Sequence, residues 1–365
     1  MIRFTIVYYK VAYINRPNTK GNMVGIRKRG EDIRQFILDN VENHPRDVAG
    51  LAVKTFDITR QAVNKHMQRL VEQGALIVSG STKNRHYVLH PLLQWETIIS
   101  LSDKPTEDGI WRNDIEPKLG KLPDNVRDLW HYGFTEMMNN AIDHSEGKQV
   151  NINLTKTAMS TELVLFDNGV GIFRKIQNLL GLEDERHAVL ELSKGKLTTD
   201  PARHTGEGIF FSSRMFDDFR ILSGNVFFSH THAQDEDWIL ENQKFQTGTG
   251  VFMKLKNNTA RTVKKVFDEF TTGDEYGFTK TVVPVKLAQY GNEKLISRSQ
   301  AKRLMARVDR FKVVILDFDN VEAIGQAFAD EVFRVFAAQH PNIEISMLHA
   351  NKNVQQMIQR ALSNG

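Results

Sequence analysis

Three side chains in the stretch EMMNNAIDHS, residues 136–145, could do chemistry together. Glu136, Asn140 and Asp143 are spaced i, i+4 and i+7, so an α-helix places them along one face. A carboxylate there can serve as a general base, and an amide oxygen can bind a hard cation. Amphipathic helices also have polar faces that only meet solvent, so this stretch alone leaves both interpretations open.

The chain after this helix contains further motifs that could form part of a site. Two strands are predicted at residues 149–157 and 161–168. The apolar run of the second strand ends at Asp167, which is the first residue of the Asp-x-Gly-x-Gly turn DNGVGIF. Later, GEGIFF puts Gly206 and Gly208 at the start of another helix, and QTGTGVFMKL predicts a closing strand. Each motif alone also fits an ordinary turn or cap, but their shared order and spacing are more specific.

Together, the four motifs resemble the ATPase domain shared by gyrase B, MutL, Hsp-type chaperones, histidine kinases and anti-sigma-factor kinases (the GHKL type). EMMNNAIDH is similar to the N box, DNGVGI to the first glycine box, GEGIFF to the second, and GTGVFMKL to the closing strand. The resemblance covers about residues 100–258, and we assign residues 96–270 to this domain. It implies a Bergerat-type α/β sandwich that binds ATP with Mg²⁺.

The resemblance also implies a role for each site residue. Glu136 is expected to polarise an attacking water or hydroxyl as the catalytic base, and Asn140 to bind the Mg²⁺ that bridges the phosphates. Asp167 is expected to accept a hydrogen bond from the adenine amino group. The other residues expected to bind the nucleotide are Asp143, Gly169, Gly171, Lys194, Lys196, Gly206, Gly208 and Thr249.

The segment between the two glycine boxes is polar and basic, and it is expected to form a lid over the nucleotide. Lys194 or Lys196 would reach the phosphates from this lid, and the sequence does not decide which. Gly206 and Gly208 open a helix whose N–H groups and positive dipole end suit phosphate oxygens.

The sequence leaves open whether ATP is hydrolysed, transferred or only bound, so an enzymatic activity is uncertain. Histidine kinases carry a phospho-acceptor histidine in a helical hairpin before the ATPase domain. The preceding stretch, residues 93–123, is too short for such a hairpin and is broken by Pro105 and Pro117. A two-component kinase is therefore disfavoured, and His131 and His144 are expected to have structural or capping roles.

Positive charge is concentrated in the N-terminal quarter of the chain. Residues 1–22 carry four basic and no acidic residues, and residues 23–95 carry eleven basic and seven acidic ones, whereas the remainder is net acidic. Apolar periodicity in residues 30–90 predicts three helices and then a hairpin with a basic tip. The stretch TRQAVNKHMQRLVEQGAL resembles small bacterial winged-helix regulators, so we assign residues 23–95 to a winged helix-turn-helix domain.

Such domains insert their third helix into the major groove and lay the wing beside the backbone. Thr59 is expected to cap this helix, and Gly74 to end it. The alternative is a winged helix that binds protein, and the basic hairpin tip weighs against it. The residues expected to contact double-stranded DNA are Arg60, Gln61, Asn64, Lys65, Lys83 and Arg85.

Residues 1–22 form an N-terminal extension that these patterns do not explain. It is either a basic arm or an upstream leader, because KGNM resembles a translated ribosome-binding site before a true start at Met23. Lys10 interrupts the apolar stretch at the start, and no run approaches the ~18 apolar residues that a membrane span needs. The chain has no cysteine, so we expect a cytoplasmic protein without membrane contact.

Residues 271–365 alternate between predicted strands and helices, beginning with a strand at residues 283–290. LDFDNVEAIGQAFADEVFRVF resembles the STAS-like fold of anti-sigma-factor antagonists, which implies a protein partner. In those proteins a serine just after the central strand is phosphorylated. This chain has Gly325, Gln326 and Ala327 there, so kinase regulation of this domain is in doubt.

The expected fold is therefore a multidomain α+β chain with a winged helix-turn-helix, a GHKL ATPase domain and a STAS-like domain. The expected function is transcriptional regulation in which nucleotide binding controls DNA binding. Two alternatives remain open. One is a serine/threonine kinase of the anti-sigma type that acts on a separate partner, and the other is an ATPase in defence or DNA remodelling. The sequence also leaves open a homodimer.

Overall fold

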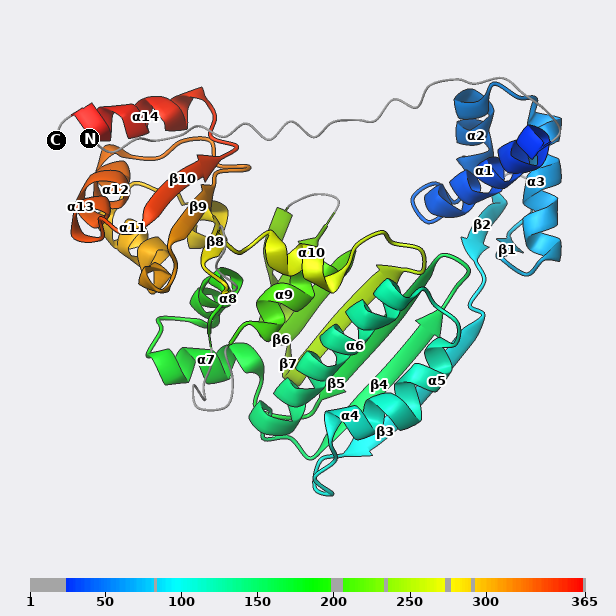
Figure 1. The fold of residues 1–365 in the computed structure, drawn as a ribbon, viewed down its shortest axis with the longest axis horizontal. Coiled ribbons are helices and arrows are strands. Elements are labelled where there is room, and N and C mark those ends of the chain that lie inside the picture. The colour runs from blue at the N-terminus through cyan, green and yellow to red at the C-terminus, as the bar shows by residue number, and fades with distance from the viewer. Residues whose placement is uncertain are drawn as a thin grey trace.

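The chain is a mixed α/β protein with three parts (Figure 1). A small helical part lies at the upper right of Figure 1, a large sheet with helices lies in the centre, and a second α/β part lies at the upper left. Within the described ranges, no helix is both long and apolar enough to cross a membrane. The computed structural model describes residues 24–81, 84–197, 206–232, 236–272, 277–289 and 293–363.

The N-terminal part has the predicted order of three helices and an antiparallel hairpin. The third helix begins where the Thr59 hydroxyl accepts a hydrogen bond from the backbone N–H of Ala62, at 3.3 Å, so the predicted N-cap is confirmed. Ile37, Val63 and Met67 are buried in a core of this part's own. The elements are α1 (Val24–Asn40), α2 (Val48–Phe56), α3 (Arg60–Glu72), β1 (Leu76–Ser79) and β2 (His86–Leu89).

Two contacts connect the α1 region with the central part. Lys254 Nζ lies 2.9 and 2.8 Å from the two carboxylate oxygens of Glu42. Gln35 donates a hydrogen bond to the sulfur of Met159 at 3.3 Å, and Met159 is buried in the N-terminal core although it belongs to the central part of the chain. Met159, the neighbouring Ala158 packed against the same core, and the Glu42–Lys254 ion pair therefore connect the N-terminal part to the central part.

The central part is built on a five-stranded antiparallel sheet in the order β3-β4-β5-β7-β6. The predicted strands at residues 149–157 and 161–168 are confirmed. The expected domain boundary at residues 95/96 falls inside β3, because that strand already pairs with β4 from Leu93 onward. The strands are β3 (Leu93–Ser100), β4 (Gln149–Lys156), β5 (Ser160–Asp167), β6 (Asp218–Thr231) and β7 (Glu236–Lys256).

Helices cover one face of this sheet, with α6 lying along the strands in front of them (Figure 1). The apolar side of α6 contributes Trp130, Phe134 and Met138 to the core between helix and sheet, and all three are fully buried. The helices of the central part are α4 (Glu107–Ile110), α5 (Glu116–Leu119), α6 (Asp124–Asn139), α7 (Ile172–Leu180), α8 (Glu185–Lys194), α9 (Gly208–Met215) and α10 (Val263–Asp268).

The C-terminal part contains a parallel three-stranded sheet in the order β10-β9-β8. The first strand, predicted at residues 283–290, instead ends at Pro284, where the chain enters a 3₁₀ turn that buries Val285 and Leu287. The elements are β8 (Lys280–Pro284), α11 (Arg298–Met305), β9 (Val313–Asp317), α12 (Gln326–Asp330), α13 (Ala337–Gln339), β10 (Glu344–Leu348) and α14 (Lys352–Ser363). Glu331–Phe336 joins α12 to α13 as a π-helical segment.

The central and C-terminal parts share one continuous hydrophobic core. An aromatic cluster crosses between them, with the Phe278 ring centroid 4.5 Å from that of Phe210 and 5.0 Å from that of Phe311. Phe270 packs 4.9 Å from Phe210 in the same cluster. Aromatic contacts at these distances stabilise packing beyond the burial of area alone.

Candidate functional site

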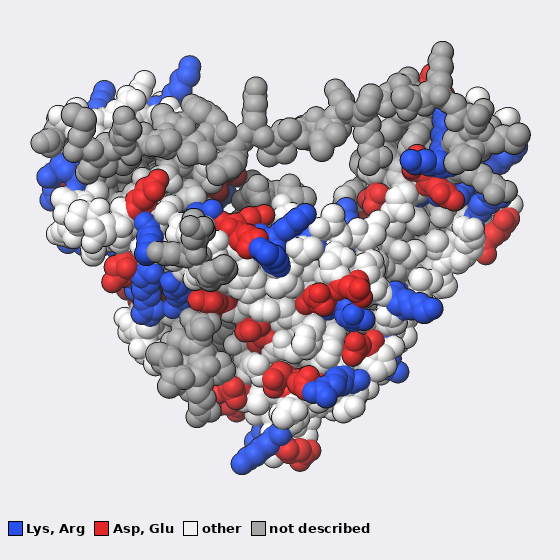
Figure 2. Space-filling view, in the orientation of Figure 1, with Lys and Arg blue, Asp and Glu red and all other residues white. Residues whose placement is uncertain are grey.

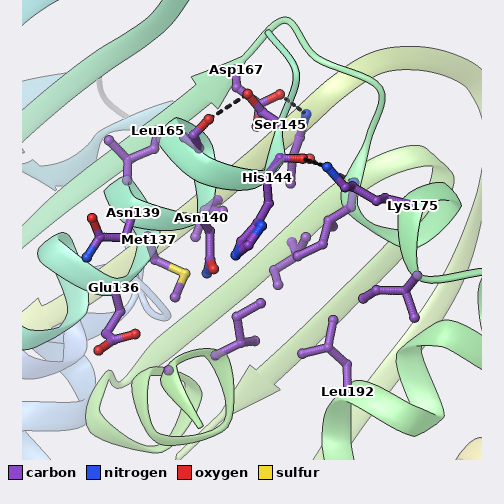
Figure 3. Close-up of a pocket in the computed structure, with 18 of the residues that line it drawn as sticks. Glu136, Met137, Asn139, Asn140, His144, Ser145, Leu165, Asp167, Lys175 and Leu192 are labelled. Carbon is purple, nitrogen blue, oxygen red and sulfur yellow. Dashed lines mark hydrogen bonds between the residues drawn. The ribbon is translucent and has the colours of Figure 1, made fainter. Parts of the chain in front are cut away.

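A cavity of about 400 Å³ lies in the central part, beside α6 and the sheet (Figure 3). Residues from the four sequence motifs meet here although up to 113 positions separate Glu136 from Thr249. The predicted site residues that line the cavity are Glu136, Asn140, Asp167, Gly206, Gly208 and Thr249.

The end of α6 determines which polar side chains face the cavity. After Asn139 the helix continues as a π-helical turn, Asn140–His144. Because π-helical bonds join residues i and i+5 rather than i and i+4, the turn changes which side chains share a face. Asp143 is consequently exposed and outside the cavity lining, so its predicted nucleotide contact is not supported. His144 lines the cavity instead, and Figure 3 shows it on the same side as Glu136 and Asn140.

Asp167 ends β5 as a buried carboxylate, with 6% of its surface exposed. Its Oδ1 accepts hydrogen bonds from the backbone N–H groups of Gly169 at 2.8 Å and Thr249 at 3.2 Å. Burial raises the pKa of Asp167 above its usual value, and the bonds from Gly169 and Thr249 partly oppose that rise. Both backbone bonds reach Oδ1, and the Thr249 side chain also hydrogen-bonds the carboxylate, so Asp167 is held in place by the turn and by β7.

The first glycine box shapes the wall behind the cavity. A Cβ at Gly169 would lie 2.0 Å from the backbone carbonyl oxygen of Ser145, so a larger residue would require the backbone to shift. Gly171 precedes α7 with a φ of +90°. Neither glycine lines the cavity: Gly169 lets the turn pack against Ser145, whereas a Cβ at Gly171 would meet the Ser223 hydroxyl oxygen at 2.6 Å.

The second glycine box brings α9 against the end of α6. A Cβ at Gly208 would lie 2.0 Å from Oε2 of Glu136, so glycine lets the helix start beside that carboxylate without displacing the Glu136 side chain. Gly206 and Gly208 both line the cavity. The N-terminal end of α9 and its backbone N–H groups therefore lie at the cavity, a position that favours anionic groups.

The two lid lysines do not line the cavity. Lys194 is 1% exposed, and its Nζ donates to Glu191 at 2.7 Å and to the carbonyl oxygens of Arg303 and Ala306 at 3.2 and 2.8 Å. Lys196 Nζ donates to the carbonyl oxygen of Arg310 at 3.1 Å. Both ammonium groups are held by the C-terminal part, so the prediction that either binds phosphate is not supported.

Lys175, which the sequence analysis missed, is the lysine that does line the cavity. It lies on α7, and its Nζ donates to the carbonyl oxygen of His144 and to Glu146 Oε1, both at 2.8 Å. Its signal in the sequence was its position one turn after Gly171, which opens α7. Lys175 joins α7 to the π turn and places one positive charge at the edge of the cavity (Figure 3).

This arrangement suits a ligand with a polar ring and an anionic tail. The buried Asp167 can accept a hydrogen bond from an amino group, and the α9 start can receive the anion. Among the described residues, no group of three or more His, Asp or Glu side chains could hold a metal. A cation at Asn140 would therefore need oxygens from the ligand, as Mg²⁺ commonly takes from phosphates.

The candidate DNA contacts lie in the N-terminal part, away from the residues that line the cavity. The Arg60, Gln61, Asn64 and Lys65 side chains are exposed on α3, as predicted. Arg85 is exposed, and its guanidinium carbon lies 5.3 Å from the centre of the Tyr87 ring. Lys83 lies outside the described residues.

Comparison with known proteins identifies the C-terminal part. Residues 300–355 match the family described as a STAS-like domain of unknown function (DUF4325). A search of curated proteins finds no match to the chain. The matched residues run from α11 to the start of α14 and include β9 and β10. The prediction of a STAS-like C-terminal domain is therefore confirmed, and the chain carries such a domain.

Proposed function

We propose that this chain is a cytoplasmic ATP-binding regulator in which the nucleotide controls DNA binding. The observation that carries the proposal is the cavity that Glu136, Asn140 and Asp167 line together with Gly206 and Gly208 at the start of α9. Asp167 would recognise the adenine amino group, Asn140 would bind Mg²⁺, and the N–H groups at Gly208 would meet the phosphates. A five-stranded antiparallel sheet with helices on one face is consistent with the GHKL (Bergerat) type.

The N-terminal part would be the DNA reader of this regulator. Its helix order, the polar exposed side of α3 and the adjoining hairpin support a winged helix-turn-helix. α3 would enter the major groove, and Arg85 on the hairpin would approach the phosphate backbone. In this proposal double-stranded DNA is the partner of residues 24–89.

The STAS-like domain would receive the nucleotide signal through α8. Leu192 and Leu197 line the cavity, and the lysines between them hold the C-terminal part. The carbonyl oxygen of Lys194 also accepts a hydrogen bond from the Thr281 hydroxyl at 2.7 Å. A ligand that shifts residues 192–197 must therefore act on the STAS-like domain as well.

One observation weighs against a kinase that phosphorylates its own STAS-like domain. A Cβ at Gly325 would lie 2.8 Å from the Cα of Ile296, so a serine does not fit there without backbone movement. A kinase acting on a separate partner and a simple ATPase remain alternatives. Radiolabelled ATP distinguishes them: label in protein indicates the kinase, free phosphate indicates the ATPase, and neither indicates a binding switch.

Isothermal titration of ATP with magnesium tests the proposed site. Asp167→Asn replaces the acceptor that faces the adenine amino group with a mixed amide, and the mispaired group should weaken binding by about 1–3 kcal/mol. Asp143→Asn is the matched control, because Asp143 is exposed and outside the cavity. The amide oxygen of the substituted side chain can still accept the Gly169 and Thr249 bonds, so thermal stability should be retained. Equal ATP affinity in wild type and Asp167→Asn would reject the proposed site.

A further inference from the structure

A second cleft, of about 490 Å³, lies where the central part meets the STAS-like domain. Its walls come from α9, the end of β6, α10 and the carboxyl ends of the parallel strands β8, β9 and β10. No residue lines both this cleft and the cavity at α6. Its volume is in the range of small-molecule sites, and ligands of α/β proteins commonly bind at the carboxyl ends of parallel strands.

Basic groups outnumber acidic ones in the lining of this cleft. Arg214, Arg261 and Lys265 face it, against the carboxylates of Glu269 and Asp317. Figure 2 shows blue and red side chains close together on the surface of the central part near the STAS-like domain. The histidines in the lining are His230, His232 and His349.

Both arginines are held in place before any ligand arrives. Arg261 donates to the carbonyl oxygen of Met215 and to Asp217 Oδ1, the latter at 3.0 Å. The Arg214 guanidinium carbon lies 3.6 Å from the centre of the Phe210 ring, and its NH1 donates to the Phe210 carbonyl at 3.1 Å. Fixed guanidinium groups lose little conformational entropy on binding an oxyanion.

The STAS-like side of the cleft contributes an oriented imidazole. His349 Nδ1 lies 2.8 Å from Oδ1 of Asp317, a buried carboxylate at the end of β9 that also accepts the Asp319 backbone N–H at 3.0 Å. A carboxylate bound to one ring nitrogen sets the orientation of the whole imidazole. His349 has a φ of +51°, a conformation that non-glycine residues rarely adopt outside turns and functional sites.

We infer that this cleft binds a small phosphate-bearing anion. A phosphate group carries close to two negative charges and three strong acceptor oxygens at neutral pH, which matches a lining with Arg214, Arg261 and Lys265. Guanidinium groups suit such oxyanions, and the cleft has the size for a small molecule rather than for a polymer. Because its walls belong to both the central part and the STAS-like domain, the bound anion would bridge them.

Calorimetric titration of the full chain with inorganic pyrophosphate, without magnesium and at fixed ionic strength, tests this site. Lys265→Gln removes a cation whose side chain is exposed, so affinity should fall by about tenfold. Lys264→Gln is the matched control, because the neighbouring Lys264 pairs with Asp268 and does not line the cleft. Glu269→Gln removes an opposing carboxylate, so affinity should rise by about two- to fivefold.

The opposite signs at Lys265 and Glu269 are the decisive readout, because a folding defect would weaken binding in both variants. Neither residue lines the cavity at α6, so pyrophosphate bound at that cavity would be insensitive to both changes. The inference is overturned if wild type binds no pyrophosphate, if both variants bind it as wild type does, or if Lys264→Gln weakens binding as much as Lys265→Gln.

Discussion

Glu136 lies one turn before Asn140, where α6 passes into its π turn, and it lies against Gly208 at the start of α9. This position is suited to activating a water beside a bound phosphate. Glu136→Ala should leave ATP affinity within about twofold, since a base that acts only on the reacting water contributes little to ground-state binding. Release of inorganic phosphate should be lost.

The control for this variant is Glu162→Ala, because Glu162 is exposed on β5 and does not line the cavity. Phosphate release would be followed in both variants under identical conditions. Turnover that survives in Glu136→Ala would exclude Glu136 as the base, whatever happens to binding.

The site residues that the sequence indicated and that line one cavity depend on local geometry. Glu136 and Asn140 are one helical turn apart, and Asp167 directly ends a buried strand, so spacing alone indicates their placement. Asp143 failed because the π turn changes the helical period after Asn139, and periodicity arguments assume a regular helix. His144, expected to have a structural role, lines the cavity for the same reason.

At the scale of elements, α8 shows what spacing cannot predict. Lys194 Nζ donates hydrogen bonds to the carbonyl oxygens of Arg303 and Ala306, which follow it by more than 100 positions. The local sequence around Lys194 is only polar and basic, so it does not indicate these partners. The order of helices and strands was largely predictable from periodicity. The way α8 docks on the STAS-like domain was not, because it depends on long-range packing.

The environment of α8 makes His187 a sensitive reporter of this docking. Burial, with Lys194 and Arg303 nearby, lowers the pKa of His187 to about 4, so the folded chain disfavours its protonation. The unfolded chain binds that proton from about pH 6.5 downward, so stability should fall as the pH drops from about 6.5 to about 4, by at most about 3 kcal/mol from this group. Denaturant unfolding across this pH range would measure the loss in unfolding free energy. His187→Gln should remove the part of this pH dependence that comes from His187.

Lys194→Met tests the environment of α8 through the charge that acts on His187. The change keeps the volume buried but removes a positive charge that lowers the His187 pKa, so that pKa should rise in an NMR titration. Glu191, 2% exposed and 2.7 Å from Lys194, would lose its closest cation and destabilise the fold. An unchanged His187 titration would contradict the influence of Lys194 on the His187 pKa.

The third helix and the hairpin carry the DNA prediction. Arg85→Gln should reduce the slope of log affinity against log salt by about one unit, because one phosphate contact is lost. Asn64→Ala should instead relax sequence preference with little change in that slope. A contact to a base edge determines which sequence is bound, whereas the salt dependence comes from contacts to phosphates. Fluorescence anisotropy on genomic fragments at several salt concentrations would measure both, and Lys54→Gln on α2 is a basic control outside α3 and the hairpin. Absence of binding to any fragment at low salt would favour the protein-binding alternative.

At the scale of the whole molecule, the proposed switch predicts coupling between the cavity and α3. ATP can change DNA affinity only by its differential affinity for two arrangements, typically about 1–3 kcal/mol, or about five- to a hundredfold. Operator affinity measured with and without a non-hydrolysable ATP analogue would detect the change, with Asp167→Asn as the unresponsive control. Unchanged affinity would exclude the switch, and stoichiometric phosphate on the STAS-like domain in intact-mass spectra would favour the kinase.

The aromatic cluster around Phe278 has a consequence for how the chain can be divided. Three segments are distinguishable by their motifs, yet the cluster joins two of them into one core, while the N-terminal core is separate apart from Met159 and the neighbouring Ala158 of the central part. A chain cut at the expected boundary after residue 270 would leave Phe210 and Phe270 facing water on one fragment and Phe311 on the other. The central and STAS-like parts therefore fold as one unit and would have to be exchanged together, whereas the N-terminal part, with a core of its own, could be exchanged separately.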